Sequence, residues 1–175
     1  HGLSAAPEVI LVKNRSSNQE WLMYHANNTA NPETDYLRLD TTAATADNTF
    51  WNDTAPTSTV FSVGDSQPVN SGHGNEYVAL AFRSVTGYSK FGTYTGDATT
   101  NHSLSVTTGF RPAFLMVKRT DTTGYWIMSD SARNPNPDDI DFYVKANATD
   151  VQSQQTGQNF KFTSTGFTLG ANLAD

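Results

Sequence analysis

Apolar residues occur along this chain in short runs that polar turn residues separate. The runs are rich in β-branched and aromatic side chains, and Asn, Asp, Gly, Ser and Thr bound them. Such runs are typical of short antiparallel β-strands. We therefore expect strands at Pro7–Lys13, Glu20–Tyr24, Tyr36–Leu39, Val60–Val63, Tyr77–Phe82, Phe114–Arg119, Tyr125–Met128, Asp141–Lys145 and Phe160–Thr163.

The same pattern gives no sign of stable helices. No window of about eleven residues carries apolar side chains at the period of an amphipathic helix. The segment Ala43–Ala46 is too short and too rich in Thr to hold a helix on its own. The sequence predicts an all-β chain.

The apolar pattern also repeats. Pro7–Lys13 followed by Trp21 recurs as Pro112–Lys118 followed by Trp126, and both landmarks give one offset, 118 − 13 = 126 − 21 = 105. Repeats of this kind organise the whole fold, because each copy is one structural unit. Two further matches keep the same order, Gly2-Leu3 with Gly109-Phe110 and Ser58–Gly64 with Ser164–Gly170.

These matches define two units, at about residues 1–86 and 107–175, that residues 87–106 join. We expect both units to form a single domain over residues 1–175. Its predicted architecture is an antiparallel two-sheet sandwich, of the jelly-roll or concanavalin-like kind, built from two sequence-related halves. The strand-like run Tyr77–Phe82 has no counterpart in the second unit, so we expect the chain to be cut from a longer repetitive protein.

Composition excludes several classes of partner. Hydrophobic residues make up 37%, mean hydropathy is -0.50, and no apolar run approaches the roughly 18 to 20 residues of a membrane span. The net charge of -6 and the scattered Lys and Arg residues argue against nucleic acid. The absence of Cys excludes disulfides, thiolate nucleophiles and zinc sites that need sulfur.

Several strings resemble a known family. They are His1-Gly2-Leu3, Gly87–Gly92 with Tyr94-Thr95-Gly96, and Gly109–Phe114 with Lys118-Arg119. They are similar to a repeated β-rich domain of unknown function in virion and tail-fibre proteins of marine tailed phages. Such domains often stand in tandem, sometimes behind a SPRY-type domain. The resemblance implies a location on the virion surface or outside the cell, contact with a host surface, and no agreed catalytic residues.

Trp51 stands in a polar segment and has no counterpart in the second unit. An exposed ring beside Asn52 and Asp53 suits the apolar face and the hydroxyls of a sugar. The alternative is a ring that closes one end of the sandwich. By contrast, Trp21 and Trp126 start matching strands, so we expect both rings to fill the core.

An acidic segment between two expected strands carries calcium-type ligands. Asp138, Asp139 and Asp141 follow Asn134 and Asn136, and calcium prefers such oxygen ligands. The spacing does not match an EF-hand, and a stabilising turn is the alternative. The sequence thus predicts no certain cofactor, with calcium as the candidate at this loop.

An initial His-Gly pair resembles the copper-binding start of some polysaccharide monooxygenases. His1 aligns with Thr108 in the second unit, which favours a turn over a copper ligand. No nucleophile elbow of the Gly-x-Ser-x-Gly type occurs, and we assign no catalytic residue.

These observations favour a non-enzymatic module that contacts carbohydrate on a bacterial host surface. The second hypothesis is a purely structural virion part that spaces or decorates the particle. Its open strand edges would pair with other copies or with neighbouring repeats. A carbohydrate-active enzyme is the third.

Overall fold

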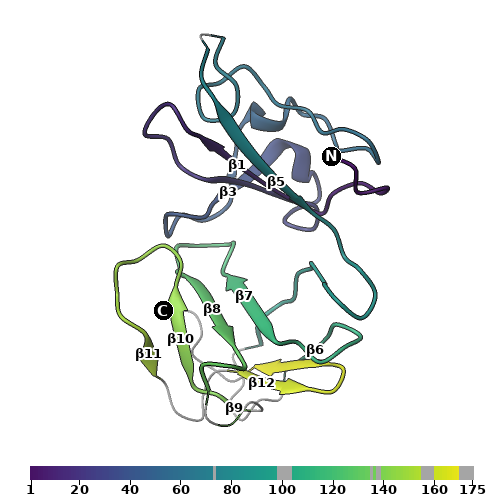
Figure 1. The fold of residues 1–175 in the computed structure, drawn as a ribbon, viewed down its shortest axis with the longest axis vertical. Coiled ribbons are helices and arrows are strands. Elements are labelled where there is room, and N and C mark those ends of the chain that lie inside the picture. The colour runs from purple at the N-terminus through teal and green to yellow at the C-terminus, as the bar shows by residue number, and fades with distance from the viewer. Residues whose placement is uncertain (73, 98–103, 135, 137–138, 155–159, 170–175) are drawn as a thin grey trace. The chain divides into compact units, whose positions relative to one another are not determined.

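The computed structural model describes residues 1–72, 74–97, 104–134, 136, 139–154 and 160–169. Its regular structure is almost entirely β, with three antiparallel sheets and two short 3-10 helices (Figure 1). The all-β prediction is confirmed. No helix within these ranges is long and apolar enough to cross a membrane.

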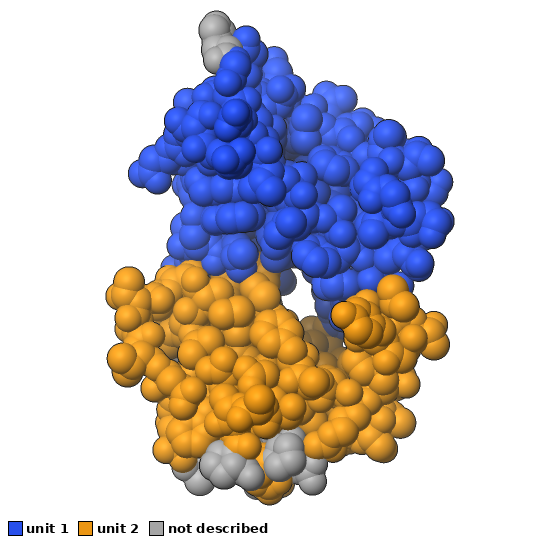
Figure 2. Space-filling view, in the orientation of Figure 1, with its two compact units in different colours: residues 1–84, 90–93, 120–123 blue, residues 85–89, 94–119, 124–175 orange. Residues whose placement is uncertain are grey.

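The chain divides into two compact units (Figure 2). Unit 1 comprises residues 1–84, 90–93 and 120–123, and unit 2 comprises residues 85–89, 94–119 and 124–175. Each unit has its own cluster of buried apolar side chains. The described residues thus show two cores where we expected one shared core.

Unit 1 is built on one five-stranded sheet. Strand β1 (Val9–Asn14) lies inside this sheet, between two other strands, and from Ile10 to Asn14 its residues alternate between buried and half-buried, as the side-chain period of two requires. All neighbouring strands are antiparallel. Their order is β4 (Ala46–Asp47), β3 (Asp35–Arg38), β2 (Leu22–His25), β1 and β5 (Tyr77–Phe82).

One face of this sheet carries the core of unit 1. Ile10 and Val12 of β1 are almost fully buried on that face. The layer that covers them is not a second sheet: it consists of the 3-10 helix η2 (Thr49–Trp51) and irregular chain. A second 3-10 helix, η1 (Pro32–Thr34), begins with a proline, whose fixed φ suits the first turn. The covering side chains are Phe50, Trp51, Phe61, Val63 and Val69.

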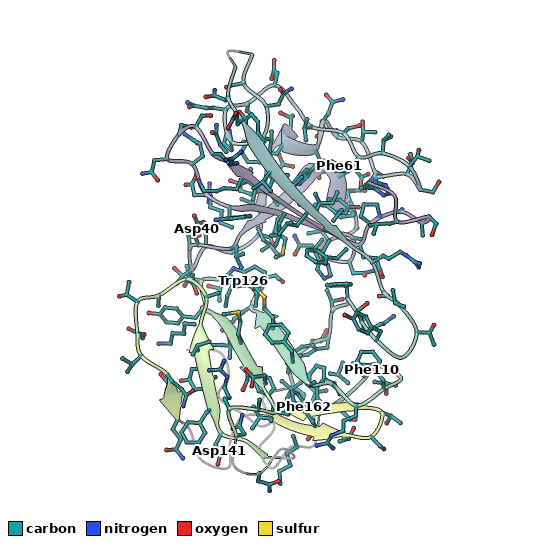
Figure 3. All side chains as sticks on the ribbon, viewed as in Figure 1. Asp40, Phe61, Phe110, Trp126, Asp141 and Phe162 are labelled. Atoms are coloured by element: carbon teal, nitrogen blue, oxygen red, sulfur yellow. The ribbon has the colours of Figure 1, made fainter. Side chains whose placement is uncertain are left out.

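Unit 2 contains two four-stranded sheets, and its core draws side chains from both. Phe162, labelled in Figure 3, is one of the buried rings of that core. The first sheet has the order β11 (Ser153–Gln154), β10 (Phe142–Lys145), β8 (Trp126–Asp130) and β7 (Phe114–Lys118). The second has the order β6 (Leu104–Thr107), β13 (Gly166–Leu169), β12 (Phe160–Thr163) and β9 (Asp139–Ile140).

The first sheet of unit 2 matches the sheet of unit 1 strand by strand. Val9 pairs with His25 and Phe114 pairs with Asp130, an offset of 105 on both strands. The pairings of β1 with β2, of β2 with β3 and of β3 with β4 all recur in unit 2, with an offset of 105 on β1 and β2 and of 107 on β3 and β4. Strand order and register are therefore the same in both ladders.

Hydrogen bonds at the ladder ends match as well. The backbone N–H of Trp21 donates to Asp40 Oδ2 at 3.2 Å, and that of Trp126 donates to Asn147 Oδ1 at 2.9 Å. Asp40 follows β3 just as Asn147 follows β10, and Figure 3 labels Asp40 and Trp126. The same tryptophan positions thus anchor the second and third strands in both units, and Trp126 is buried as expected whereas Trp21 is half-buried.

Most of the expected strands are present, with small shifts at their ends. One expectation is wrong: residues 60–63 form no strand, although their counterparts 166–169 form β13. In unit 2, β13 lies between β6 and β12. The counterpart of β12 in unit 1 contains Pro56, which has no N–H for a ladder. Gly170, the end of the matched segment, lies outside the described residues.

Candidate functional site

Trp51 is a core residue. Its side chain is 1% exposed, its Nε1–H donates to the Asp35 carbonyl oxygen at 2.9 Å, and its ring meets that of Tyr24 edge-on at 5.8 Å. A ring in this position offers no face to a sugar. The expectation of an exposed platform at Trp51 is therefore corrected: the ring is buried in the core of unit 1.

Asn52 and Asp53 follow the buried ring and are exposed. Both have a left-handed backbone, with φ of 54° and 44°, a conformation that Asn and Asp adopt more readily than most residues. The backbone N–H of Asn52 donates to the Thr49 carbonyl oxygen at 2.9 Å and ends η2. These two side chains stand at the surface without the ring that was expected beside them.

The two units satisfy one backbone carbonyl in different ways. Asp35 and Phe142 are counterparts, because β3 and β10 share one register. Trp51 Nε1 donates to the Asp35 carbonyl oxygen, whereas Ser129 Oγ donates to that of Phe142. Ser129 is the counterpart of Tyr24, whose hydroxyl stands at the far end of an aromatic ring and not on Cβ as in serine. Trp51 therefore has a structural role that a serine fills in unit 2.

The acidic segment is organised by a buried asparagine. Asn134 Oδ1 accepts the backbone N–H groups of Asp141 and Phe142, both at 2.8 Å, and its Nδ2 donates to the Asp130 carbonyl oxygen at 2.8 Å. Asp141 lies just before β10 (Figure 3). These bonds link the Asn134 side chain to the end of β8 and to the start of β10.

The calcium prediction stays a prediction for the residues it named. Asp138 lies outside the described residues, and of Asp139 only the backbone is described. Across the described ranges, no group of three or more His, Asp or Glu residues is placed to hold a metal ion.

His1 sits in a turn that unit 2 repeats with a threonine. The backbone nitrogen of His1 donates to the Thr59 carbonyl oxygen at 3.2 Å, and that of Thr108 donates to Thr165 at 2.9 Å. His1 Nδ1 accepts the N–H of Leu3 at 3.3 Å, and Thr108 Oγ1 accepts the matching N–H of the second unit at 3.4 Å. The imidazole therefore caps a repeated turn.

A difference between the two ladders marks the strongest candidate site. β1 has two neighbours, β2 and β5, and β5 runs alongside it in Figure 1. Its counterpart β7 pairs only with β8 within the described part of the chain. We call the side of Phe114–Val117 that faces away from β8 the β7 edge. Backbone donors and acceptors on such an edge are a template for another strand.

Burial follows the same difference. Val9 of β1 is 5% exposed, whereas its counterpart Phe114 is 57% exposed. Four of the six residues of β1 are buried, but none of the five residues of β7 is. An apolar ring with this exposure beside an unpaired edge is the combination that strand-addition sites present to partners.

A second exposed aromatic stands on a loop of unit 2. The Tyr88 ring is 82% exposed at a turn that the paired residues Val85 and Ser89 close. Gly87 at that turn has φ of 74°, a left-handed conformation open to glycine. The string Gly87–Gly92 includes this loop, but no pattern in the sequence distinguishes Tyr88 from a core aromatic.

Comparisons with known proteins identify one family. Residues 1–174 match the family described as Domain of unknown function (DUF7483). No curated protein and no solved structure matches the chain. The family description names no activity.

Proposed function

Because this chain belongs to the DUF7483 family of unknown function, we propose a role that its own geometry supports, that of a non-enzymatic assembly module. It belongs to a larger repetitive protein of the virion or tail-fibre type, located on a particle surface or outside the cell. It joins neighbouring repeats or other copies through strand edges. The observation that carries this proposal is the matched pair of ladders: one has the flanking strand β5, and the other ends at β7 as far as the described residues go.

The correspondence between the units supports a common origin. Order, register, the Trp21 and Trp126 bonds, and the His1 and Thr108 turns agree between the units. One repeated unit, duplicated and then altered in its covering layer, accounts for this agreement. In this proposal each unit is one copy of the repeat that the sequence places at about residues 1–86 and 107–175.

Sedimentation velocity of the chain over a wide range of concentration tests the assembly role. We expect the weight-average sedimentation coefficient to rise with concentration, because an open edge that finds an edge of another copy forms a reversible complex. The folded state is checked by circular dichroism at each end of the range. A coefficient that stays constant for the folded chain would contradict the proposal.

A specific observation favours a second candidate function, contact with a bacterial surface glycan. The Tyr88 ring is exposed at the tip of its turn, and an exposed aromatic face is what sugar CH groups stack on. A glycan array run with calcium and with chelator tests this role. We expect Tyr88→Ala to abolish binding and Val151→Ala, at an equally exposed apolar residue, to leave it unchanged. An array on which the folded chain binds no glycan would contradict it.

A further inference from the structure

Within the described part of the chain, β7 lacks the flanking strand that β5 provides for β1. We propose that it binds an extended apolar strand with the sequence pattern of β5, supplied by another repeat unit. This inference rests on the assembly function and adds to it the site, the class of partner and the register. Strand addition of this kind gains affinity from main-chain hydrogen bonds and specificity from alternate side chains.

The register of the incoming strand follows from unit 1. β5 pairs with β1 over all six of its residues. β1 pairs with β2 in the same register in which β7 pairs with β8. The same offset of 105 therefore transfers the β1–β5 pairing to the β7 edge. The pairs to transfer are Val9 with Phe82, Ile10 with Ala81, Leu11 with Leu80 and Val12 with Ala79.

The side chains of both strands agree with this register. Ala79 and Ala81 share a face with the core residues of β1, so small residues in the incoming strand would meet Leu115 and Val117, which line the core of unit 2. On the other face a Phe would stand opposite Phe114. Aromatic pairs across antiparallel strands are favourable, and this pair would cover the exposed ring.

Two other sheet edges and one irregular segment fit such a strand less well. β4 and β11 are two residues long, so each offers little ladder to pair with. In unit 2, β6 pairs with β13, whose first residue is Gly166. The counterpart of Gly166 in unit 1 is Val60, so a strand placed beside residues 60–63 as β6 lies beside β13 would meet the Val60 side chain. A Cβ at Gly166 would lie 2.0 Å from the Val106 carbonyl oxygen. That position in unit 1 is therefore closed to a strand in the same register.

A synthetic peptide of residues 75–84 serves as the probe, added to the full chain. Amide hydrogen exchange is measured with the peptide and with a variant that carries prolines at Leu80 and Ala81. Because neighbouring N–H groups alternate in direction, one of these two prolines removes a ladder donor. We expect the first peptide to slow exchange at residues 114–117 by about tenfold or more, and the proline peptide to leave it unchanged.

A receptor variant locates the site independently. Phe114→Asp adds a charge opposite the incoming Phe, and we expect the peptide Kd to rise about tenfold, which corresponds to about 1.4 kcal/mol. Val60→Asp is the matched control, because Val60 is 58% exposed and lies outside the proposed site. Both variants alter exposed side chains, and circular dichroism verifies that they fold.

Slowed exchange at residues 114–117 that requires the unmodified peptide and Phe114 supports the proposal. Absence of binding, equal binding of the proline peptide, or slowed exchange elsewhere alone overturns it. Sedimentation of the chain without peptide is measured in parallel. If the chain associates while residues 114–117 stay unprotected, the proposed site at the β7 edge is wrong but the assembly function is still supported. If the chain does not associate at any concentration, the assembly function itself is wrong.

Discussion

The β1 and β7 ladders have the same strand order and register but different burial. Four of six residues are buried in β1 and none of five in β7. The hairpins that join neighbouring strands set register locally in both units. Burial depends on what lies beyond the ladder, and only β1 has a flanking strand within the described residues. Repeated sequence therefore fixes strand pairing, while neighbouring strands decide which residues become core.

The layers that cover the two ladders differ in a second way. Unit 2 uses a hairpin with Phe160 and Phe162, whereas Thr54 and Pro56 stand at the matching places in unit 1. Neither residue supplies a large apolar side chain, and Pro56 cannot donate to a ladder. Trp51 is the largest fully buried side chain, and Phe160 comes next. The same sheet face is thus covered by a helical turn in one unit and by a second sheet in the other.

The largest expected effect comes from removing these two rings. Trp51→Ala deletes a buried ring and its bond to the Asp35 carbonyl, and we expect the free energy of unfolding of unit 1 to fall by about 4 kcal/mol. Phe160→Ala should cost unit 2 a similar amount. Urea unfolding followed by circular dichroism measures the loss, and amide exchange assigns it to a unit.

The control for both is Val151→Ala, which we expect to change the free energy of unfolding by less than about 0.5 kcal/mol because the side chain is exposed. If Trp51→Ala speeds exchange in β7 and β8 as much as in β1 and β2, the two cores unfold as one. The comparison between independent units would then be wrong.

Substitution of Gly166 should affect stability far more than substitution of its counterpart in unit 1. In Gly166→Ala the new Cβ would lie 2.0 Å from the Val106 carbonyl oxygen, so β6 or β13 has to move. We expect a loss of about 3 kcal/mol in the free energy of unfolding of unit 2. Val60→Ala, at the matching position, should change stability by less than about 0.5 kcal/mol. Thermal unfolding of both variants checks this, and equal melting temperatures would contradict the steric argument.

The bonds that anchor the tryptophan positions should differ in strength. The bond from the Trp126 N–H to Asn147 is partly buried, whereas that from the Trp21 N–H to Asp40 is exposed. We expect Asn147→Ala to lower the free energy of unfolding by about 1 to 2 kcal/mol and Asp40→Ala by about 0.5 kcal/mol. Urea titrations of the two variants compare them directly, and a larger loss in Asp40→Ala would reverse the assignment.

Much of this architecture was predictable from sequence, and the rest fails for identifiable reasons. Alternating apolar runs gave strands such as Tyr77–Phe82 with the bounds that the structure has. Val60–Val63 has the same local pattern but no partner strand among the described residues. The local pattern cannot show whether a partner strand is present. Trp51 was misplaced because the groups that bury it, Tyr24 and the Asp35 carbonyl, come from distant parts of the chain. Nothing in the local pattern indicated that the Phe114 ring is exposed.

The smallest expected effect is a difference in acid sensitivity at one matched position, where His25 ends β2 and Asp130 ends β8. Burial lowers the pKa of His25 below its ordinary value of 6.5, against a backbone hydrogen bond and the charge of Glu8. Burial opposes the shift at Asp130, but hydrogen bonds and the charge of Arg133 lower its pKa below 3.8. In both cases the folded state binds fewer protons than the unfolded state, so stability falls as pH falls.

The two windows differ. The contribution of His25 is complete above pH 6.5 and is lost as pH falls from there through the lowered pKa. That of Asp130 is complete above pH 3.8 and is lost only in stronger acid. Unfolding free energies measured across pH should therefore show unit 1 weakening first, and His25→Gln should remove that early loss while Asp130→Asn removes the later one. If His25→Gln leaves the slope between neutral and mildly acidic pH unchanged, burial of that imidazole does not set the acid sensitivity of unit 1.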